Sequence, residues 1–226
     1  MKIKTPLTKQ RLRTHFTYHF WKYILSAALC GFCINLLYTT TAYRSPENLR
    51  IDIYLQSASA SQTKVDAFME KVWQASVPDM ETVNTILLLS STTDDTYSTM
   101  QLATYIMAHE GDMYALCTED FKRYAGQGVF VDLSPYIESG ELNVDGIDLA
   151  SGYVTLLDDD GNPTDSQSLY GIPLYTLTGY ADEFGMNSSD MVIAVTAYNG
   201  NEENVIAFLN EMIREGRGSD AESANP

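Results

Sequence analysis

The sequence contains few of the residues on which most enzymes and disulfide-rich secreted domains depend. Its 226 residues include three cysteines and three histidines, and only Cys117 and His109 of these lie beyond position 43. A single cysteine forms no internal disulfide, so a domain in that portion must be held together by an ordinary hydrophobic core. Nucleophile-elbow, zinc, phosphate-loop and dinucleotide-binding motifs are absent as well. We therefore predict a protein that is not an enzyme and uses no cofactor.

Acidic residues are missing from the start of the chain, and basic residues are scarce in the rest. Residues 1–22 contain six lysines and arginines and no acidic residue. The positions from 44 onward contain thirty acidic and eight basic residues, a formal charge of −22. This negative charge disfavours nucleic acid as a partner of that portion.

An uncharged, largely apolar run occupies residues 23–41. It is long enough to cross a hydrocarbon core of about 30 Å at about 1.5 Å per helical residue. Because basic segments stay in the cytoplasm, we predict a single-pass protein of the cell membrane, with a cytoplasmic segment 1–22, a transmembrane helix 23–42, a linker 43–50 and an extracytoplasmic acidic portion. A cleaved signal peptide is the alternative, since residues 40–42 are small, but the run is longer than a usual signal core.

The remaining chain alternates between strand and helix patterns. Apolar runs predict strands at 51–55, 83–89, 113–117, 153–157, 169–176 and 191–197, with a turn-rich stretch at 158–167. Helices are predicted at 62–77, at 96–110 with Gly111 as its C-cap, from 118, from 134, and at 201–215. The continuous apolar residues 86–89 indicate a strand buried on both faces. Short strand–helix connections predict an α/β fold with a mostly parallel sheet flanked by helices over residues 51–215, followed by a disordered tail, 216–226.

Five motifs follow one another in this portion: Gly111-Asp112 before a strand, a helix end at 124–128, Asp-Leu-Ser-Pro-Tyr at 132–136, Leu-Tyr-Gly-Ile-Pro at 169–173, and the strand and helix at 191–197 and 201–213. In this order they resemble the first lobe of the extracellular solute-binding proteins that serve ABC importers. The resemblance covers roughly residues 50–215. It implies a periplasmic-binding-protein-like lobe of the family 1 type.

The sequence departs from this family between the fourth and fifth motifs. There the family has a whole second lobe, whereas this chain has only residues 174–190, and domains rarely fall below about 50 residues. The resemblance thus implies a single-lobe relative, in which small-molecule affinity is weak unless a second protein or a second copy supplies the other wall. The expected function is a membrane-anchored solute-binding-like module that assists capture of a sugar or peptide for an ABC importer. The alternative is an interaction or assembly protein that keeps the fold but has lost small-molecule binding, with a transporter permease or another membrane protein as partner.

Ligands of open α/β sheets bind beyond the carboxyl ends of the strands. The predicted ligand-binding residues there are Gln56, Ser57, Ser91, Thr92, Thr118 and Glu119, with Tyr175 as a stacking residue for a sugar ring. Tyr97 and Tyr180 are further candidates for stacking. The structural alternative is that Thr118, Ser61 and Asp95 cap helices and that the tyrosines pack as ordinary surface or core residues.

Three further features favour structural interpretations. The run 158–162, Asp-Asp-Asp-Gly-Asn, lacks the register of a calcium loop and suits a hairpin turn, so no metal site is predicted. Cys117 has no basic residue close in sequence, which indicates a buried structural thiol. His109 lies at a predicted helix end, where a protonated imidazole complements the helix dipole.

Overall fold

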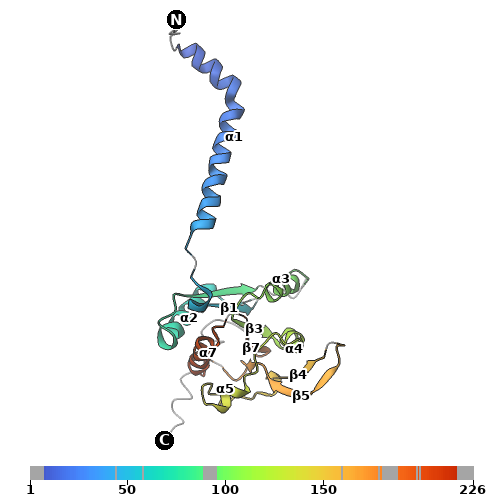
Figure 1. The fold of residues 1–226 in the computed structure, drawn as a ribbon. Helices are drawn as coiled ribbons and strands as arrows, with labels where there is room; N and C mark the ends of the chain where they lie inside the picture. Colours follow the sequence, from blue (N-terminus) through green and yellow to red (C-terminus); the bar gives the residue numbers. More distant parts are fainter. Residues whose placement is uncertain are drawn as a thin grey trace. The chain divides into compact units, whose positions relative to one another are not determined.

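The computed structural model of the protein describes residues 8–43, 45–57, 59–88, 96–158, 160–177, 179, 188–196, 198 and 200–217. The chain divides into two compact units, residues 1–44 and 45–226. The first contains one helix, α1 (Lys9–Thr41), and the second is an α/β domain (Figure 1).

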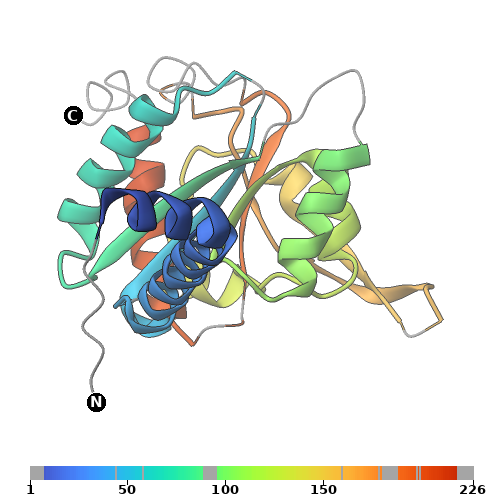
Figure 2. The same cartoon turned by 90° about the horizontal axis from the view of Figure 1, so that it is seen from above.

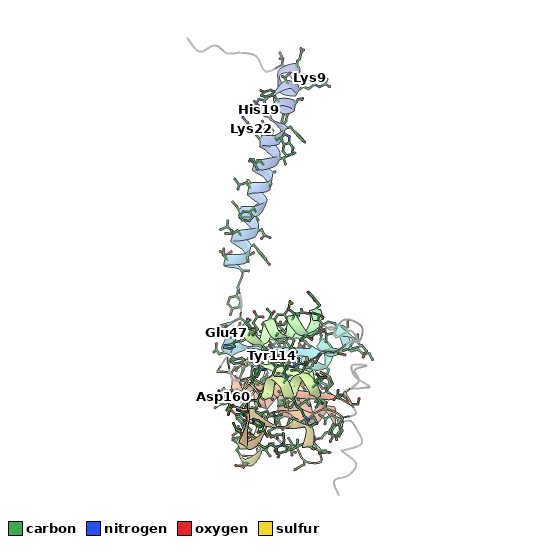
Figure 3. All side chains as sticks on the ribbon, turned by 90° about the vertical axis from the view of Figure 1, so that its right-hand side faces the viewer. Lys9, His19, Lys22, Glu47, Tyr114 and Asp160 are labelled. Carbon is green, nitrogen blue, oxygen red and sulfur yellow. The ribbon has the colours of Figure 1, made fainter. Side chains whose placement is uncertain are left out.

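Helix α1 is the apolar segment of the chain. Its part Arg13–Thr41 is long and apolar enough to cross a membrane, by length and composition. A membrane anchor and a signal sequence both meet that description. The helix begins before the apolar run, because the basic segment is also helical from Lys9 onward; Figure 3 shows Lys9, His19 and Lys22 along it.

The domain is built on a five-stranded sheet with the order β2-β1-β3-β7-β6. The strands are β1 (Arg50–Gln56), β2 (Thr82–Leu88), β3 (Met113–Cys117), β6 (Ile172–Pro173) and β7 (Met191–Val195). Strands β2, β1 and β3 are parallel, and β7 is antiparallel to both β3 and β6. All strands except β7 therefore run in one direction, which confirms the predicted mostly parallel sheet.

Helices cover both faces of this sheet. Figure 2 shows α2 (Gln62–Ser76) and α7 (Glu202–Gly216) on one side, and α3 (Thr96–Met107) and α4 (Thr118–Ala125) on the other. The smaller elements are η1 (Glu47–Leu49), α5 (Ser134–Glu138), η2 (Ala150–Gly152) and a hairpin of β4 (Tyr153–Leu157) and β5 (Pro163–Leu169). The α/β fold class predicted from the sequence is confirmed.

Alternation along β1 divides the core into two clusters. Ile51, Ile53 and Leu55 are fully buried in the cluster that includes the apolar stripes of α2 and α7. Tyr54 points to the opposite face, into the cluster formed with α3 and α4, where its ring stacks on Tyr114 at 4.9 Å. Figure 3 shows Tyr114 inside the domain. Ile51, Ile53 and Leu55 therefore form an apolar face of β1, whereas on the opposite face Tyr54 lies between the polar residues Asp52 and Gln56.

Strand β2 differs from its prediction. It is the edge strand of the sheet, and Val83, Ile86 and Leu87 are only half-buried. The prediction that β2 is buried on both faces was wrong for most of the strand. A continuous apolar run shows that the side chains of a strand are apolar, but it does not show whether the strand lies in the centre or at the edge of the sheet. Of the described positions in that run, only Leu88 is buried.

The segment predicted as one strand at 169–176 is divided between two sheets. Leu169, the first residue of this segment, is the last residue of β5. Because β5 already begins at Pro163, only the first half of the predicted turn-rich stretch 158–167 is a turn. The chain then crosses to β6 at Gly171. A Cβ atom at Gly171 would lie 2.5 Å from the Val192 side chain and 2.7 Å from the Phe121 ring. The close approach of these side chains requires glycine at the crossing point.

The hairpin turn at Asp158 confirms the turn interpretation of the acidic run. The Asp158 carboxylate accepts hydrogen bonds from the backbone N–H groups of Asp160 and Asn162, at 3.0 and 2.7 Å. Gly161 has the positive φ of +80° that the turn requires. The described residues contain no group of three or more His, Cys, Asp or Glu side chains that could hold a metal ion.

Helix α3 ends at Met107, earlier than predicted, and His109 forms its C-terminal cap instead of Gly111. His109 has φ +54°. Its N–H donates to Ile106 O, and the N–H of Glu110 donates to Tyr105 O; these are the two hydrogen bonds of a Schellman motif. The His109 ring stacks on Tyr198 at 4.2 Å. Its position at a helix end was predicted correctly.

At the other end of the domain, α7 continues through Gly216, one residue into the segment predicted as a tail. Gly216 is buried.

Candidate functional site at the carboxyl ends of β1 and β3

Gln56 is the last residue of β1 and lies at the edge where a ligand is expected. Its Nε2 donates to Asp120 Oδ2 at 2.9 Å, and its Oε1 accepts from the backbone N–H of Cys117 at 2.9 Å. The side chain of Gln56 is buried, as is that of Asp120. Both ends of the amide thus join the end of β1 to the start of α4.

Asp120 is the centre of this network, and sequence reasoning missed it. Its second carboxylate oxygen, Oδ1, accepts from Arg123 at 3.0 Å, and the Cys117 thiol donates to Oδ2 at 3.4 Å. Arg123 neutralises a carboxylate that would be costly to bury alone. A signal was available, because Asp120 and Arg123 are three residues apart in a helix that follows a strand end.

Cys117 is a half-buried thiol within the same network. Burial raises its pKa above the ordinary value, and the Asp120 carboxylate adds to this effect through charge repulsion with the thiolate. A raised pKa keeps the thiol protonated and poorly nucleophilic at neutral pH. The structural interpretation of Cys117 agrees with this environment.

Ser57 and Thr118 are also engaged in internal hydrogen bonds. The Ser57 hydroxyl accepts from the backbone N–H groups of Ser59 and Ala60, at 3.3 and 3.1 Å, and so organises the turn before α2. Thr118 is the first residue of α4, with Cys117 at the N-cap position and no side-chain cap. Its backbone N–H donates to Asp190 O at 3.0 Å, and its hydroxyl donates to the same oxygen at 3.5 Å.

The helix caps predicted for Thr118 and Ser61 are therefore not formed. Thr118 binds Asp190, next to β7, because the antiparallel return strand brings a free carbonyl beside it. Ser61 occupies the N-cap position of α2, but its side chain makes no capping hydrogen bond. Asp95 lies outside the described residues.

Glu119, Tyr175 and Tyr97 are the described candidates with exposed side chains. The Glu119 side chain is 85% exposed, with Arg123 Nη2 at 3.4 Å. Tyr175 is exposed, follows β6, and its hydroxyl donates to Asp148 O at 3.2 Å. Tyr97 is exposed on α3, whereas Ser91, Thr92 and Tyr180 lie outside the described residues.

The Gly-Asp motif before β3 has a structural explanation. Gly111 has φ +83°, and a Cβ atom there would lie 2.6 Å from the Tyr54 ring. The Asp112 carboxylate accepts from the backbone N–H of Asp52 at 2.8 Å, and its carbonyl accepts from Thr196 N at 2.9 Å. The motif fastens β3 to strands on both of its sides.

Other motif residues also hold the chain together. The Asp132 carboxylate accepts from the backbone N–H of Ser134 at 2.9 Å, at the start of α5. Ile172 pairs with Ile193, so the strand after Tyr-Gly joins the return strand β7 directly. The motif residues described in these two paragraphs thus hold neighbouring strands and the start of α5 in place.

Comparison with known proteins gives the following relations. No protein-family model and no curated protein matches the chain. Among solved structures it is similar to an extracellular solute-binding protein family 1 from Alicyclobacillus acidocaldarius subsp. acidocaldarius DSM 446, with 19% identity, a TM-score of 0.41, and coverage of 55% of this chain and 27% of that one.

Two further similar structures are sugar-binding proteins by their descriptions. An ABC substrate-binding protein from Listeria monocytogenes in complex with cycloalternan has 25% identity and a TM-score of 0.36, covering 54% of this chain and 28% of that one. The galacto-N-biose-/lacto-N-biose I-binding protein of the ABC transporter from Bifidobacterium longum has 16% identity and a TM-score of 0.36, covering 55% and 28%. The matched region spans little more than a quarter of each structure. All three are proteins of the class that the sequence motifs resemble.

Proposed function

We propose that this chain is a membrane-anchored, extracytoplasmic module with a single solute-binding-like lobe. The observation that carries the proposal is the direct pairing of β6 with β7, Ile172 with Ile193, at the point where the motifs of a two-lobed receptor would lead into a second lobe. One lobe offers a solute only one wall. The module assists capture of a sugar or a peptide when an ABC importer subunit or another membrane protein supplies the opposite wall.

The anchor in this proposal is α1, with the basic segment in the cytoplasm and the acidic domain outside. Its length and composition support the assignment, as does the separation of charges along the chain. Protease treatment of intact cells tests the topology, and the acidic domain is expected to be digested from outside. In cells without protease, the whole protein is expected in the membrane fraction. A protease-resistant domain, or a released one, would contradict it.

Calorimetric titration of the full chain in detergent micelles tests solute capture. Lactose, maltotriose and trialanine are the probes, and we expect saturable binding of at least one with Kd on the order of 1 mM, about −4 kcal/mol. Glu119→Ala should weaken binding, since Glu119 is exposed at the carboxyl edge, whereas Asp145→Ala, an exposed acidic control elsewhere, should leave it unchanged.

A second candidate function is an interaction or assembly protein that has lost solute binding. It is favoured by the hydrogen bonds at the carboxyl edge, where both ends of the Gln56 amide and the Ser57 hydroxyl already have partners within the chain. The titration distinguishes the two candidates. Absence of saturable heat with all three probes, together with a membrane protein that co-purifies stoichiometrically, would favour this second function.

A further inference from the structure

The outer side of β2 carries backbone groups that the sheet does not use. The backbone N–H of Ser57 donates to Leu88 O at 3.0 Å, so Leu88 and the residues of the same parity direct their backbone groups toward β1. Val83, Thr85 and Leu87 then direct theirs outward, because β2 is at the end of the sheet. Among the described residues, the outward N–H groups of these three have no hydrogen-bond partner.

A side-chain amide already bonds to this edge from outside the sheet. Gln62, at the start of α2, donates from Nε2 to Thr85 O at 3.2 Å and to Asp66 Oδ1 at 2.7 Å. The Gln62 amide thus stands where the N–H group of an added strand would lie. The edge of β2 accepts an amide donor in the geometry of the structure itself.

A hollow of about 610 Å³ runs beside this edge. It is lined by Asp52, Gln62, Asp66, Val83, Asn84, Thr85 and Ile86. Its two charged members are acidic. Asp52 pairs with Arg50 at 2.7 Å, whereas the bond that Asp66 makes in the described part of the chain comes from the neutral Gln62. The hollow therefore favours a positively charged occupant.

The strand itself lacks the usual protection of an exposed edge. Natural edge strands are guarded by charged side chains, proline or bulges. Residues 82–88, Thr-Val-Asn-Thr-Ile-Leu-Leu, contain neither a charge nor a proline, and β2 pairs with β1 in unbroken register. Apart from the Gln62 amide at Thr85 O, the described part of the chain leaves this edge open to a further strand.

We propose that the outer edge of β2 binds an extended peptide segment with lysine or arginine side chains, which adds to the sheet as a sixth strand. The backbone groups of Val83, Thr85 and Leu87 hold its main chain, and Asp66 attracts its basic side chains. A second copy of this domain is a poorer occupant, since each copy carries the strong negative charge of the acidic portion and would set Asp66 near its own image. The inference is independent of solute capture, because it uses a lateral edge and not the carboxyl ends of β1 and β3.

Fluorescence anisotropy with the full chain in detergent micelles tests this inference. The probe is a labelled, capped peptide of sequence Thr-Lys-Val-Lys-Val-Lys-Thr, and its partner probe has glutamate in place of lysine. We expect the glutamate peptide to bind at least about tenfold more weakly. Two further probes are N-methylated at the lysines or at the valines and threonines. Alternate N–H groups of a strand point to opposite edges, so only one of the two N-methylated peptides loses the N–H groups that face β2. That peptide should bind at least about tenfold more weakly, and the other should lose less than about twofold in affinity.

Variants of β2 and α2 complete the test. Thr85→Pro removes an outward N–H and should abolish peptide binding. The fold should tolerate this substitution, because proline is accepted in edge strands. Asp66→Asn and Gln62→Ala change exposed side chains: the first should weaken the lysine peptide about threefold or more, and the second should tighten it. Asp145→Asn is the matched loss of charge and should have no effect.

Three results would overturn the inference. The first is equal affinity for the lysine and glutamate peptides. The second is equal loss of affinity with both N-methylated sets, which would indicate binding without strand addition. The third is a concentration-dependent dimer that Thr85→Pro abolishes, which would show that a second copy occupies the edge.

Discussion

Strands β1 and β2 are neighbours that both contain several apolar residues, but β1 lies inside the sheet and β2 lies at its edge. Leu55 of β1 and Leu87 of β2 are register partners, and Leu55 is fully buried whereas Leu87 is half-buried. Gln56, at the end of β1, has both ends of its amide bonded within the chain. The outward N–H groups of β2, by contrast, have no hydrogen-bond partner among the described residues. The difference shows that position in the sheet, and not composition, decides how far a strand is buried and whether its backbone groups are paired.

The leucine pair gives the largest expected effect. Leu55→Ala should lower the free energy of unfolding by about 3–4 kcal/mol, because it leaves a cavity in the core, and Leu87→Ala by about 1–2 kcal/mol. Urea unfolding of the full chain, followed by Trp73 fluorescence in a Trp21→Phe background, measures both. Equal losses would mean that the edge of β2 is covered.

The amide pair extends the comparison to polar side chains. Gln56→Ala should lower the free energy of unfolding by about 2 kcal/mol, since it leaves the Cys117 N–H without its partner and removes the Nε2 donor from the buried Asp120 carboxylate. Asn84→Ala on β2 should cost about 0.5 kcal/mol, because its exposed amide bonds to Asp52 at 2.7 Å in contact with water. The same unfolding measurement applies, and the reverse order would refute the assignment of Gln56 as structural.

The Cys117 thiol tests how closed the end of β1 is. In a Cys30→Ser, Cys33→Ser background, iodoacetamide should modify Cys117 at least about tenfold more slowly in the folded protein than in urea at pH 7.5, since its pKa is raised by burial. Gln56→Ala should accelerate the reaction by opening the network. Rapid modification of the folded protein would contradict the closed edge.

The helical layer that covers both strands gives the smallest expected effect. The Lys71 ammonium of α2 bonds to Glu215 of α7, and this hydrogen bond lowers the pKa of the Glu215 carboxyl below its usual value. A lowered folded-state pKa stabilises the fold above the unfolded pKa of about 4.3, and that contribution is lost as the pH falls through the folded value.

Glu215→Gln should therefore cost less than about 1 kcal/mol at pH 7, because Lys71 is largely exposed, and less still at pH 3. Unfolding curves of the variant and the parent at the two pH values check the sign. A larger loss at pH 3 than at pH 7 would exclude this pair as the cause.

The order of strands and helices could be predicted because its signals are local. The apolar alternation at 51–55 and the helical spacing of Val65, Phe68, Met69 and Val72 each lie within a few residues, and the structure confirms both. Caps were predicted less well. His109 takes the left-handed position that Gly111 was expected to take, because the preceding helix ends sooner and Gly111 is needed beside the Tyr54 ring.

The candidate site was only partly predictable for a related reason. The carboxyl ends of the strands could be located from their sequence, but Asp120, the partner of Gln56, is 64 positions away along the chain. Nothing in the sequence around Gln56 indicates that its amide is already bonded. Thr118 was expected at the right edge, but its hydrogen bonds depend on where Asp190, 72 positions away along the chain, comes to lie.

The sequence by itself determined an apolar N-terminal helix, an acidic α/β portion and the succession of its elements, because side-chain polarity and spacing act within single helices and strands. The tertiary structure alone decided that β2 lies at the edge, that the chain changes sheets at Gly171, and that the polar end of β1 is closed by α4. These outcomes depend on which distant segments become neighbours. A strand carries the same residues in the middle of a sheet or at its margin, and only its neighbours decide whether its backbone groups are already paired.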